Sequence, residues 1–397
     1  MTLVTPTGEQ PSTQRPMRLL QVVPYYPPAW GFGGPPRVMW EEARDLVRRG
    51  HRVDVVTTDV LDGEGRVDEG RVDSCEGVQI HRVRNLSNSL AYRHNRFTAL
   101  GLRRALGRVN ADVVHLSELR HQLAIATWRE VRNRDLPLVV SAFGSLCGSA
   151  GLLGAMKITY DRLWVQPMLR QATVLLATTQ HEASGYVAAG GDSNRVEIVP
   201  LGTGRPPLPG DPIDLGVPDD AQVLLFLGRI HHTKGIERLI TAFKQVAARH
   251  PDFYLVVVGR DDGALRGLRD LVRHLDIDGR VRFPGPIYGD RRYDAYRRAS
   301  LFAITSIEFE ETSTASLEAA AVGTPLLVSA EAEVPYLSEY RAGFTLTKDQ
   351  DLAELLDGTL SADLTEMGKR AKTMIEERHM WTIVGGQIEE ILLRAIR

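Results

Sequence analysis

Short runs of apolar residues alternate along the chain with longer segments in which apolar residues recur at helical spacing. Such alternation is typical of parallel sheets whose faces are covered by helices. The sequence therefore predicts an α/β protein. The expected strands lie at residues 18–23, 52–57, 78–83, 113–116, 138–141 and 196–199 in the first half, and at residues 223–227, 254–258, 281–283, 301–304 and 326–328 in the second.

Glycine and proline residues are concentrated between the two halves, at residues 200–212, where they interrupt any regular element. A chain of 397 residues is long enough for two domains of ordinary size. We predict an N-terminal extension at residues 1–16, an N-terminal domain at 17–203, a linker at 204–215 and a C-terminal domain at 216–380. A final helical segment covers residues 381–397.

The composition is that of a globular protein, because 43% of the residues are hydrophobic and 25% are charged. A net charge of −2 argues against a protein that binds nucleic acid through general positive charge. Cys75 and Cys147 are too few for a zinc site or a disulfide framework, which fits a reducing cytoplasm. Residues 136–156 carry no charge, but their interleaved glycines and serines predict a strand and a loop rather than a membrane span.

Two cations follow the first predicted strand of the second half. Gly228 and Arg229 come directly after the strand, and Lys234 precedes Gly235 at the start of a helix. Ligands of open parallel sheets bind at this edge, where a helix N-terminus also favours anions. The two side chains could hold a diphosphate and neutralise its charge as it leaves. The alternative is a solvated loop with a helix-capping turn.

Two glutamates follow the strand at residues 301–304. Glu310 comes before a predicted helix that begins near Ser313 and Thr314, and Glu318 lies inside that helix. The first-turn amides of such a helix are free for phosphate oxygens, and Glu318 could accept two hydrogen bonds from a ribose diol. Two glutamates at this spacing also occur as ordinary surface carboxylates.

Taken in this order, these motifs resemble those of the group 1 (family 4) retaining glycosyltransferases. The resemblance rests on Gly228-Arg229 with Lys234-Gly235, on the Glu310 and Glu318 pair, and on the segment Glu-Ala-Ala-Ala-Val-Gly-Thr-Pro at residues 318–325. It implies the GT-B fold, in which two Rossmann-like domains place their parallel sheets across a cleft. It also implies a nucleoside-diphosphate sugar as donor, no metal and no cofactor, and a helix at 381–397 that packs back on the N-terminal, acceptor-binding domain.

The resemblance assigns a role to each site residue. Arg229 and Lys234 would hold the donor diphosphate and stabilise its departure, Glu318 would bind the ribose, and Glu310 would face the donor sugar as nucleophile or positioning group. Main chain near Gly259 and residues 285–287 would recognise the nucleobase. The full set of expected donor-binding residues is Gly228, Arg229, Lys234, Gly259, Ile287, Ser313, Thr314 and Glu318, with Glu310, Arg229 and Lys234 as the catalytic residues.

The sequence departs from the family pattern at two positions. Glu311 stands where the family usually has glycine, which places another carboxylate beside the expected diphosphate site. In the N-terminal half, Phe143 stands where many members have histidine; we interpret it as a core residue, with stacking on the acceptor as the alternative. His115 is interpreted as a histidine of the core.

A glycine loop in the first half resembles a dinucleotide-binding fingerprint, but Pro36 occupies the position of its third glycine. In the resembled family, Gly33 and Gly34 would belong to a loop near the acceptor and the donor phosphate. A tight turn that requires glycine is the alternative for both.

Residues 77–111 contain seven arginines and no acidic residue. Arg93, Arg96, Arg103 and Arg104, with Leu90, Tyr92, Phe97 and Leu100 interleaved, are expected to contact an anionic membrane or a phosphate-bearing acceptor. A solvated arginine face is the alternative. The predicted location is the cytoplasm, peripherally on the inner face of the plasma membrane.

The sequence thus predicts a transferase that moves a sugar to a saccharide or lipid-linked saccharide, in the synthesis of cell-surface polysaccharide or glycoconjugates. Two other classes stay open. One is an inactive nucleotide-binding subunit of a polysaccharide assembly complex, suggested by Phe143 and Glu311. The other is a nicotinamide dehydrogenase, suggested only by the glycine loop and Asp59.

Overall fold

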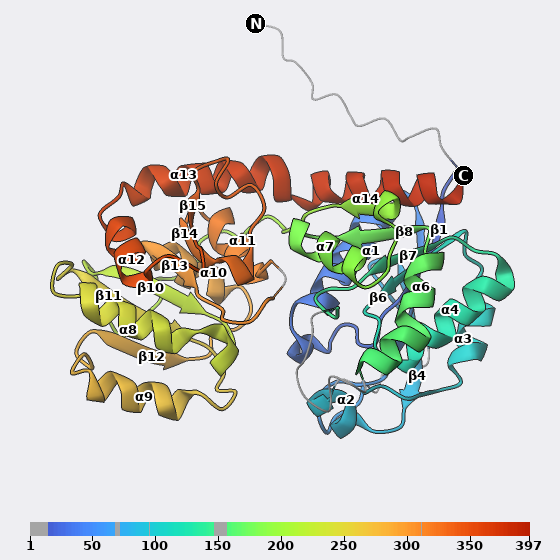
Figure 1. The fold of residues 1–397 in the computed structure, drawn as a ribbon, viewed down its shortest axis with the longest axis horizontal. Coiled ribbons are helices and arrows are strands. Elements are labelled where there is room, and N and C mark those ends of the chain that lie inside the picture. The colour runs from blue at the N-terminus through green and yellow to red at the C-terminus, as the bar shows by residue number, and fades with distance from the viewer. Residues whose placement is uncertain (1–14, 68–71, 95, 147–156, 311) are drawn as a thin grey trace, which may run out of the picture. The chain divides into compact units, whose positions relative to one another are not determined.

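The chain forms two compact units, each built around one sheet (Figure 1). The computed structural model describes residues 15–67, 72–94, 96–146, 157–310 and 312–397. The N-terminal unit comprises Met1–Leu176, Ser184–Glu197 and Gly385–Arg397, and the C-terminal unit comprises Ala177–Ala183 and Ile198–Val384. None of the helices in the described part of the chain has the length and apolar character that a membrane-spanning segment needs.

The C-terminal unit contains a parallel sheet in the order β12-β11-β10-β13-β14-β15. The chain begins in the middle with β10, adds two strands on one side, and then returns to add three on the other. Ligands of such sheets bind beyond the carboxyl ends of the strands, where the order reverses between β10 and β13. The strands are β10 (Gln222–Leu227), β11 (Phe253–Val258), β12 (Val281–Gly285), β13 (Leu301–Ile304), β14 (Leu326–Ser329) and β15 (Gly343–Leu346).

Helices surround this sheet in two groups. Helix α8 contacts α9 and α12, whereas α11 contacts α10 and α13 (Figure 1). The strands between them read as continuous apolar runs because both of their faces are covered; the four residues 255–258 are fully buried. The helices are α8 (Ile236–Val246), α9 (Leu265–His274), α10 (Arg291–Arg298), α11 (Thr314–Ala321), α12 (Leu352–Leu360) and α13 (Leu364–Met374).

The N-terminal unit contains a mixed sheet in the order β3-β4-β2-β1-β6-β7-β8-β9, with β5 paired to β4. Strands β3 and β5 run antiparallel to β4 at the edge. The strands are β1 (Arg18–Val22), β2 (Arg52–Thr58), β3 (Val72–Cys75), β4 (Val78–Asn85), β5 (Ala99–Leu100), β6 (Val113–Ser117), β7 (Leu138–Ser141), β8 (Val174–Ala177) and β9 (Val196–Ile198). The helices are α1 (Gly34–Arg48), α2 (Asn88–His94), α3 (Leu102–Arg108), α4 (Gln122–Arg134) and α6 (Gln166–Gln171). Helices α7 (Gln180–Ala188) and α14 (Trp381–Ile396) begin in residues of the C-terminal unit and end in residues of the N-terminal unit. The α/β prediction is confirmed.

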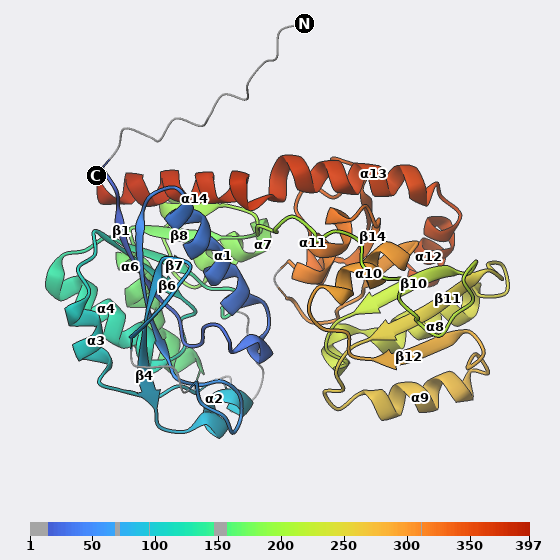
Figure 2. The ribbon, with the colours of Figure 1, turned by 180° about the vertical axis from the view of Figure 1, so that it is seen from behind.

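The end of the chain packs on the N-terminal unit. Glu389 of α14 accepts hydrogen bonds from Arg49 at 3.1 Å and contacts His51 at 2.7 Å. A Cβ atom on Gly385 would lie 1.9 Å from a carboxylate oxygen of Asp45, so glycine lets α14 approach α1 closely (Figure 2). The last residues of α14 are therefore held by both charge and close packing.

Helix α13 supports the turn in which α11 ends. A Cβ atom on Gly368 of α13 would lie 2.0 Å from the carbonyl oxygen of Gly323. Glycine is thus required in the middle of a helix, where alanine is otherwise preferred by about 1 kcal/mol.

We expect Gly368→Ala to lower the free energy of unfolding by about 2 kcal/mol, because the added methyl group must displace backbone. Gly267→Ala is the matched control: Gly267 also lies inside a helix, α9, but a Cβ atom there would meet nothing within 4 Å. That control should gain up to about 1 kcal/mol in urea unfolding. Equal effects of the two substitutions would contradict the close approach of α13.

Candidate functional site

The candidate site lies beyond the carboxyl ends of β10 and β13. The loop after β10 carries Gly228 and Arg229, continues through a 3₁₀ turn at His232–Lys234, and enters α8 at Gly235. The loop after β13 carries Glu310 and enters α11 at Ser313. Because the sheet order reverses between these strands, their loops share one edge of the C-terminal unit.

Gly235 allows the two loops to meet. Its φ is +63°, and a Cβ atom there would lie 1.8 Å from the carbonyl oxygen of Thr305. The Thr305 hydroxyl donates to the carbonyl of Gly235 at 2.9 Å, and Arg238 of α8 donates to the carbonyl of Thr305 at 2.8 Å. Only glycine fits this contact, which ties the start of α8 to the end of β13.

Lys234 and Glu310 form an ion pair across these loops, although 76 residues separate them in sequence. The other oxygen of Glu310 accepts a hydrogen bond from Ser306, and its amide donates to the carbonyl of Glu331 at 2.8 Å. Burial and then the positive charge of Arg229 lower the pKa of Lys234 to about 8. The contact with Glu310 opposes this decrease, because it favours the charged ammonium.

Arg229 lies at the exposed mouth of the site. Its guanidinium donates to Asp262, in the loop after β11, at 2.7 Å, and its side chain is 54% exposed. An exposed pair of this kind is weak, so the guanidinium can change partners at small cost. Arg229 and Lys234 together supply the positive charge of this edge.

The remaining strand ends form the floor of the site. A Cβ atom on Gly259, just after β11, would lie 1.8 Å from the carbonyl oxygen of Gly228, so the main chains of these two turns touch. The amide of Gly259 donates to the carbonyl of Gly285 at 3.2 Å. Ile287 is half-buried in the loop after β12. Three of the expected donor-binding positions therefore follow adjacent strands.

Ser313 is the N-cap residue of α11 and Thr314 is its first residue. Both are half-buried, and the Ser313 side chain makes no capping hydrogen bond, so first-turn amides of α11 are not satisfied by it. The hydroxyl of Thr312 donates to the carbonyl of Glu333 at 2.8 Å and anchors the preceding loop. Glu311, the unusual carboxylate of this segment, lies outside the described residues.

Glu318 is buried inside α11 and is held by α10. Arg292 donates to its two oxygens at 2.7 and 2.8 Å, and the Tyr296 hydroxyl donates to it at 3.2 Å. Although burial opposes it, the hydrogen bonds and charge of Glu318 raise the pKa of Arg292. Arg292 also donates to the carbonyl of Gly289 at 2.6 Å, so it links the loop after β12 to Glu318.

The sequence contains no signal that singles out Arg292. It is one of a pair of adjacent arginines at the start of α10, and only the packing of α10 against α11 brings it to Glu318. The structure thus brings together Lys234 with Glu310, and Gly228 with Gly259, and it adds Arg292 and Tyr296 beside Glu318.

Comparison with known proteins decides the family. The model of glycosyl transferases group 1 matches residues 211–377, and that of the glycosyl transferase 4-like domain matches residues 33–202. A D-inositol 3-phosphate glycosyltransferase of Kineococcus radiotolerans is 30% identical over 318 residues, which cover 73% of this chain and 71% of that protein. The chain belongs to the group 1 (family 4) glycosyltransferases.

Further relatives of this glycosyltransferase agree with that placement. A phosphatidyl-myo-inositol mannosyltransferase of Mycolicibacterium smegmatis is 29% identical over 206 residues, half of this chain and 52% of that protein. Sucrose-phosphate synthase from Thermosynechococcus elongatus has a TM-score of 0.71 at 17% identity and covers 95% of this chain and 98% of its own. HepE from Anabaena, solved in complex with UDP and glucose, has a TM-score of 0.70 at 17% identity, covering 95% of this chain and all of its own. The predicted GT-B fold is confirmed.

The N-terminal unit of the glycosyltransferase has its own reversal of strand order, between β1 and β6. Gly33, which has a φ of +98°, lies in the loop after β1 and is the N-cap residue of α1, and Gly34 is the first residue of that helix. His121 follows β6, and its Nδ1 accepts from the amide of Ala124 at 3.1 Å. Burial lowers the pKa of His121 to about 4, so the ring is neutral. Positive φ accounts for the glycine at position 33, whereas position 34 is helical.

The structure decides two interpretations of single residues in this unit. His115 is fully buried and contacts Glu42 at 2.7 Å and Ser141 at 2.8 Å, which confirms it as a core histidine. Phe143 was expected in the core, and this is wrong. It lies just beyond β7 with a φ of +44° and is only half-buried, because the chain turns out of the sheet there.

The arginine-rich segment is only partly a surface. Arg93, Arg96, Arg103 and Arg104 are exposed, as are Leu90 and Leu100. Phe97, however, is 2% exposed, and with Tyr25, Phe32 and Tyr92 it forms an aromatic cluster in which Tyr25 and Phe32 stack at 4.3 Å. The expectation that Tyr92 and Phe97 line the same surface as the arginines is wrong, because these rings pack on the loop after β1.

Substitution of Arg292 tests how much its ion pair with Glu318 contributes to the stability of the fold. Arg292→Leu should lower the free energy of unfolding by about 3 kcal/mol, because it leaves the buried Glu318 carboxylate without its partner. The double variant Arg292→Leu/Glu318→Leu should recover most of this loss, since no unpaired charge remains. Urea unfolding measures both. Additive losses in the double variant would show that the two side chains are not coupled.

Proposed function

We propose that this glycosyltransferase moves a sugar, with retention of anomeric configuration, from a nucleoside-diphosphate sugar to a saccharide or lipid-linked saccharide acceptor. The reaction would use no metal and no cofactor, and it would serve the synthesis of cell-surface polysaccharide or glycoconjugates. The observation that carries the proposal is the pairing of Lys234 with Glu310 beside Arg229, at the point where the sheet order reverses. Two structures of HepE, in complex with UDP and with UDP-glucose, support a nucleotide-sugar donor.

The donor diphosphate would replace the acidic partners of the two cations. Arg229 would leave Asp262, and Lys234 would leave Glu310, because a diphosphate offers more charge than a single carboxylate. First-turn amides of α11 and the hydroxyls of Ser313 and Thr314 would complete the anion site. As the bond between sugar and diphosphate breaks, these groups stabilise the charge that develops on the leaving oxygen.

The release of Lys234 would set Glu310 free. Its carboxylate would then face the donor sugar as nucleophile or as positioning group. Glu318 would accept hydrogen bonds from the ribose hydroxyls in place of part of its contacts with Arg292 and Tyr296. Arg292 would keep the carboxylate in position while these contacts exchange.

The acceptor would carry a phosphate group and would bind to the N-terminal unit. One relative is a D-inositol 3-phosphate glycosyltransferase and another a phosphatidyl-myo-inositol mannosyltransferase, which favours a phosphate-bearing acceptor. Exposed Arg93, Arg96, Arg103 and Arg104 support peripheral contact with an anionic membrane, and no nucleic-acid partner is proposed. Gly33 and Gly34 would lie in the acceptor-side loop.

Arg229→Ala should lower kcat/KM for donor turnover by about a hundredfold, because the leaving diphosphate loses a charge-assisted partner. Glu310→Gln should lower kcat, whereas UDP should bind more tightly, because Lys234 no longer has to leave a carboxylate when the diphosphate binds. Arg249→Ala is the matched control: Arg249 forms a similarly exposed pair with Asp357, at 3.0 Å, away from the sheet's carboxyl edge. NMR of the product would report its anomeric configuration.

Three results would overturn parts of this proposal. Unchanged turnover in Arg229→Ala and Glu310→Gln would reject the site. An inverted anomer would reject retention. Binding of UDP without turnover of any sugar donor, even with crude lipid acceptor, would favour the alternative of an inactive nucleotide-binding subunit, and a thermal shift with NAD would favour a dehydrogenase.

UDP affinity should fall as pH rises through about 8. The pKa of Lys234 is lowered to about 8, so its ammonium is charged below that pH and neutral above it. Since the diphosphate favours the charged form, the affinity should decrease by up to about tenfold per pH unit above pH 8. Calorimetry between pH 7.5 and 9.5 measures this. Lys234→Arg, which stays charged, should remove the decrease; a decrease that persists would assign it to another group.

A further inference from the structure

A hollow of about 650 Å³ lies at the edge of the N-terminal unit, beside β4 and the start of α3. None of its lining residues lies in the loops that directly follow β1, β6, β10 or β13, where the order of the strands reverses. Its charged lining residues are Asp59, His81, Arg82, Arg84, Arg104 and Arg108.

Three arginines of this hollow, Arg84, Arg104 and Arg108, carry positive charge that the described part of the protein does not neutralise. Among the described residues, the side chains of Arg84, Arg104 and Arg108 have no hydrogen-bond or ion-pair partner. The acidic lining residue, Asp59, and the histidine, His81, each have a partner outside the hollow. Asp59 accepts from Arg66 at 2.7 and 2.8 Å, and His81 contacts Asp54 at 2.6 Å.

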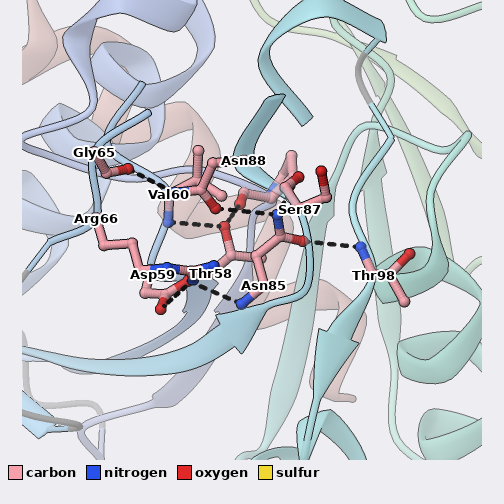
Figure 3. Close-up of polar contacts among 10 residues, drawn as sticks. Thr58, Asp59, Val60, Gly65, Arg66, Asn85, Ser87, Asn88 and Thr98 are labelled. Carbon is pink, nitrogen blue, oxygen red and sulfur yellow. Dashed lines mark hydrogen bonds and ion pairs between the residues drawn. The ribbon is translucent and has the colours of Figure 1, made fainter. Parts of the chain in front are cut away.

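Buried polar contacts hold the loop that carries Asp59, a lining residue of this hollow (Figure 3). Asn85 donates its amide N–H to Asp59 at 2.8 Å and accepts from the amide of Thr98 at 2.9 Å. Asn88 donates to the carbonyl of Gly65 at 2.6 Å. These contacts hold loop 59–67 against the end of β4 and against the segment that leads to α3. The elements that carry the arginines are therefore held in place.

A second hollow, of about 630 Å³, adjoins the first. Leu100, Gly101 and Arg104 line both. Ile125, Ala126 and Trp164 are among the other lining residues of the second hollow, which give it a largely apolar wall. Leu100, between the two, is 53% exposed. A basic hollow thus continues directly into an apolar one.

We propose that the basic hollow binds the phosphate group of an anionic lipid through Arg84, Arg104 and Arg108, with the hydrocarbon against the neighbouring apolar hollow. Guanidinium groups suit phosphate because they donate two parallel hydrogen bonds as well as charge. A soluble phosphate ester would leave the apolar hollow empty, which is why a lipid fits better. The site is separate from the donor site, and it rests on the part of the proposed function in which exposed arginines, Arg104 among them, contact an anionic membrane.

Two triple variants with the same loss of charge test a defined pocket against a diffuse basic face. The pocket variant is Arg84→Gln/Arg104→Gln/Arg108→Gln, and the control is Arg93→Gln/Arg96→Gln/Arg162→Gln, whose residues are exposed and line neither of the two hollows. Binding to vesicles of equimolar phosphatidylcholine and phosphatidylglycerol should fall about a hundredfold in the pocket variant and about tenfold or less in the control. Equal losses would overturn the pocket.

Chemical protection gives a readout on the unaltered protein. Phenylglyoxal modifies accessible arginines, and the same vesicles should slow modification of Arg84, Arg104 and Arg108 by about tenfold, with Arg93 and Arg96 slowed less. Phosphatidylcholine vesicles alone should give no protection. Protection by inorganic phosphate without protection by the anionic vesicles would reject a lipid. The Kd of UDP should be unchanged in both triple variants, which separates failure of this site from failure of the donor site.

Discussion

The contact between the backbone of Gly235 and the carbonyl of Thr305 determines where the candidate site can form. The chain enters this parallel sheet at the central strand β10, and β13 pairs beside it. The loops after these two strands therefore lie next to each other at the same edge of the sheet. Glycine at 235 removes the Cβ atom that would lie 1.8 Å from the carbonyl. With the loops in contact, Lys234 reaches Glu310, and α8 and α11 begin at the same edge. The position of the positively charged side chains in the site therefore depends on this packing.

The elements that sequence could predict are those whose burial is complete. β7 and β13 fall at the predicted residues, and β10 and β11 begin one residue earlier than predicted, because apolar runs covered on both faces are easy to recognise. β3 and β5 were not predicted, since β3 is exposed at the sheet edge and β5 has two residues. β15, a four-residue strand, is only partly buried, and it was not predicted. β8 was not predicted either, although its four residues are as apolar as those of β13. The pattern of apolar residues depends on burial, so it gives only a weak signal for strands that are short or partly exposed.

The candidate site divides in the same way. The cations and glutamates of the C-terminal unit follow strand ends, so strand prediction and sheet topology already bring Lys234 towards Glu310. The partner of Glu318 could not be foreseen, because it depends on how α10 packs against α11 and not on spacing along the chain. Phe143 failed for a related reason: an apolar residue after a buried strand is core only if the chain continues in the sheet, and a φ of +44° turns it away.

Positive charge is arranged differently in the two units. In the C-terminal unit, Arg229, Lys234 and Arg292 all have acidic partners, so an incoming anion must exchange with a carboxylate, and what it gains is the difference between two electrostatic interactions. Exchange favours selectivity, since a weak anion cannot displace the partner. In the basic hollow of the N-terminal unit, Arg84, Arg104 and Arg108 are exposed and pair with no carboxylate of the described residues, so an anion there replaces only water and counterions. Binding at the hollow should therefore be broad among phosphates and sensitive to ionic strength, as screening within about 10 Å at 0.1 M salt requires. Such a surface suits attachment, whereas the exchanging site suits chemistry.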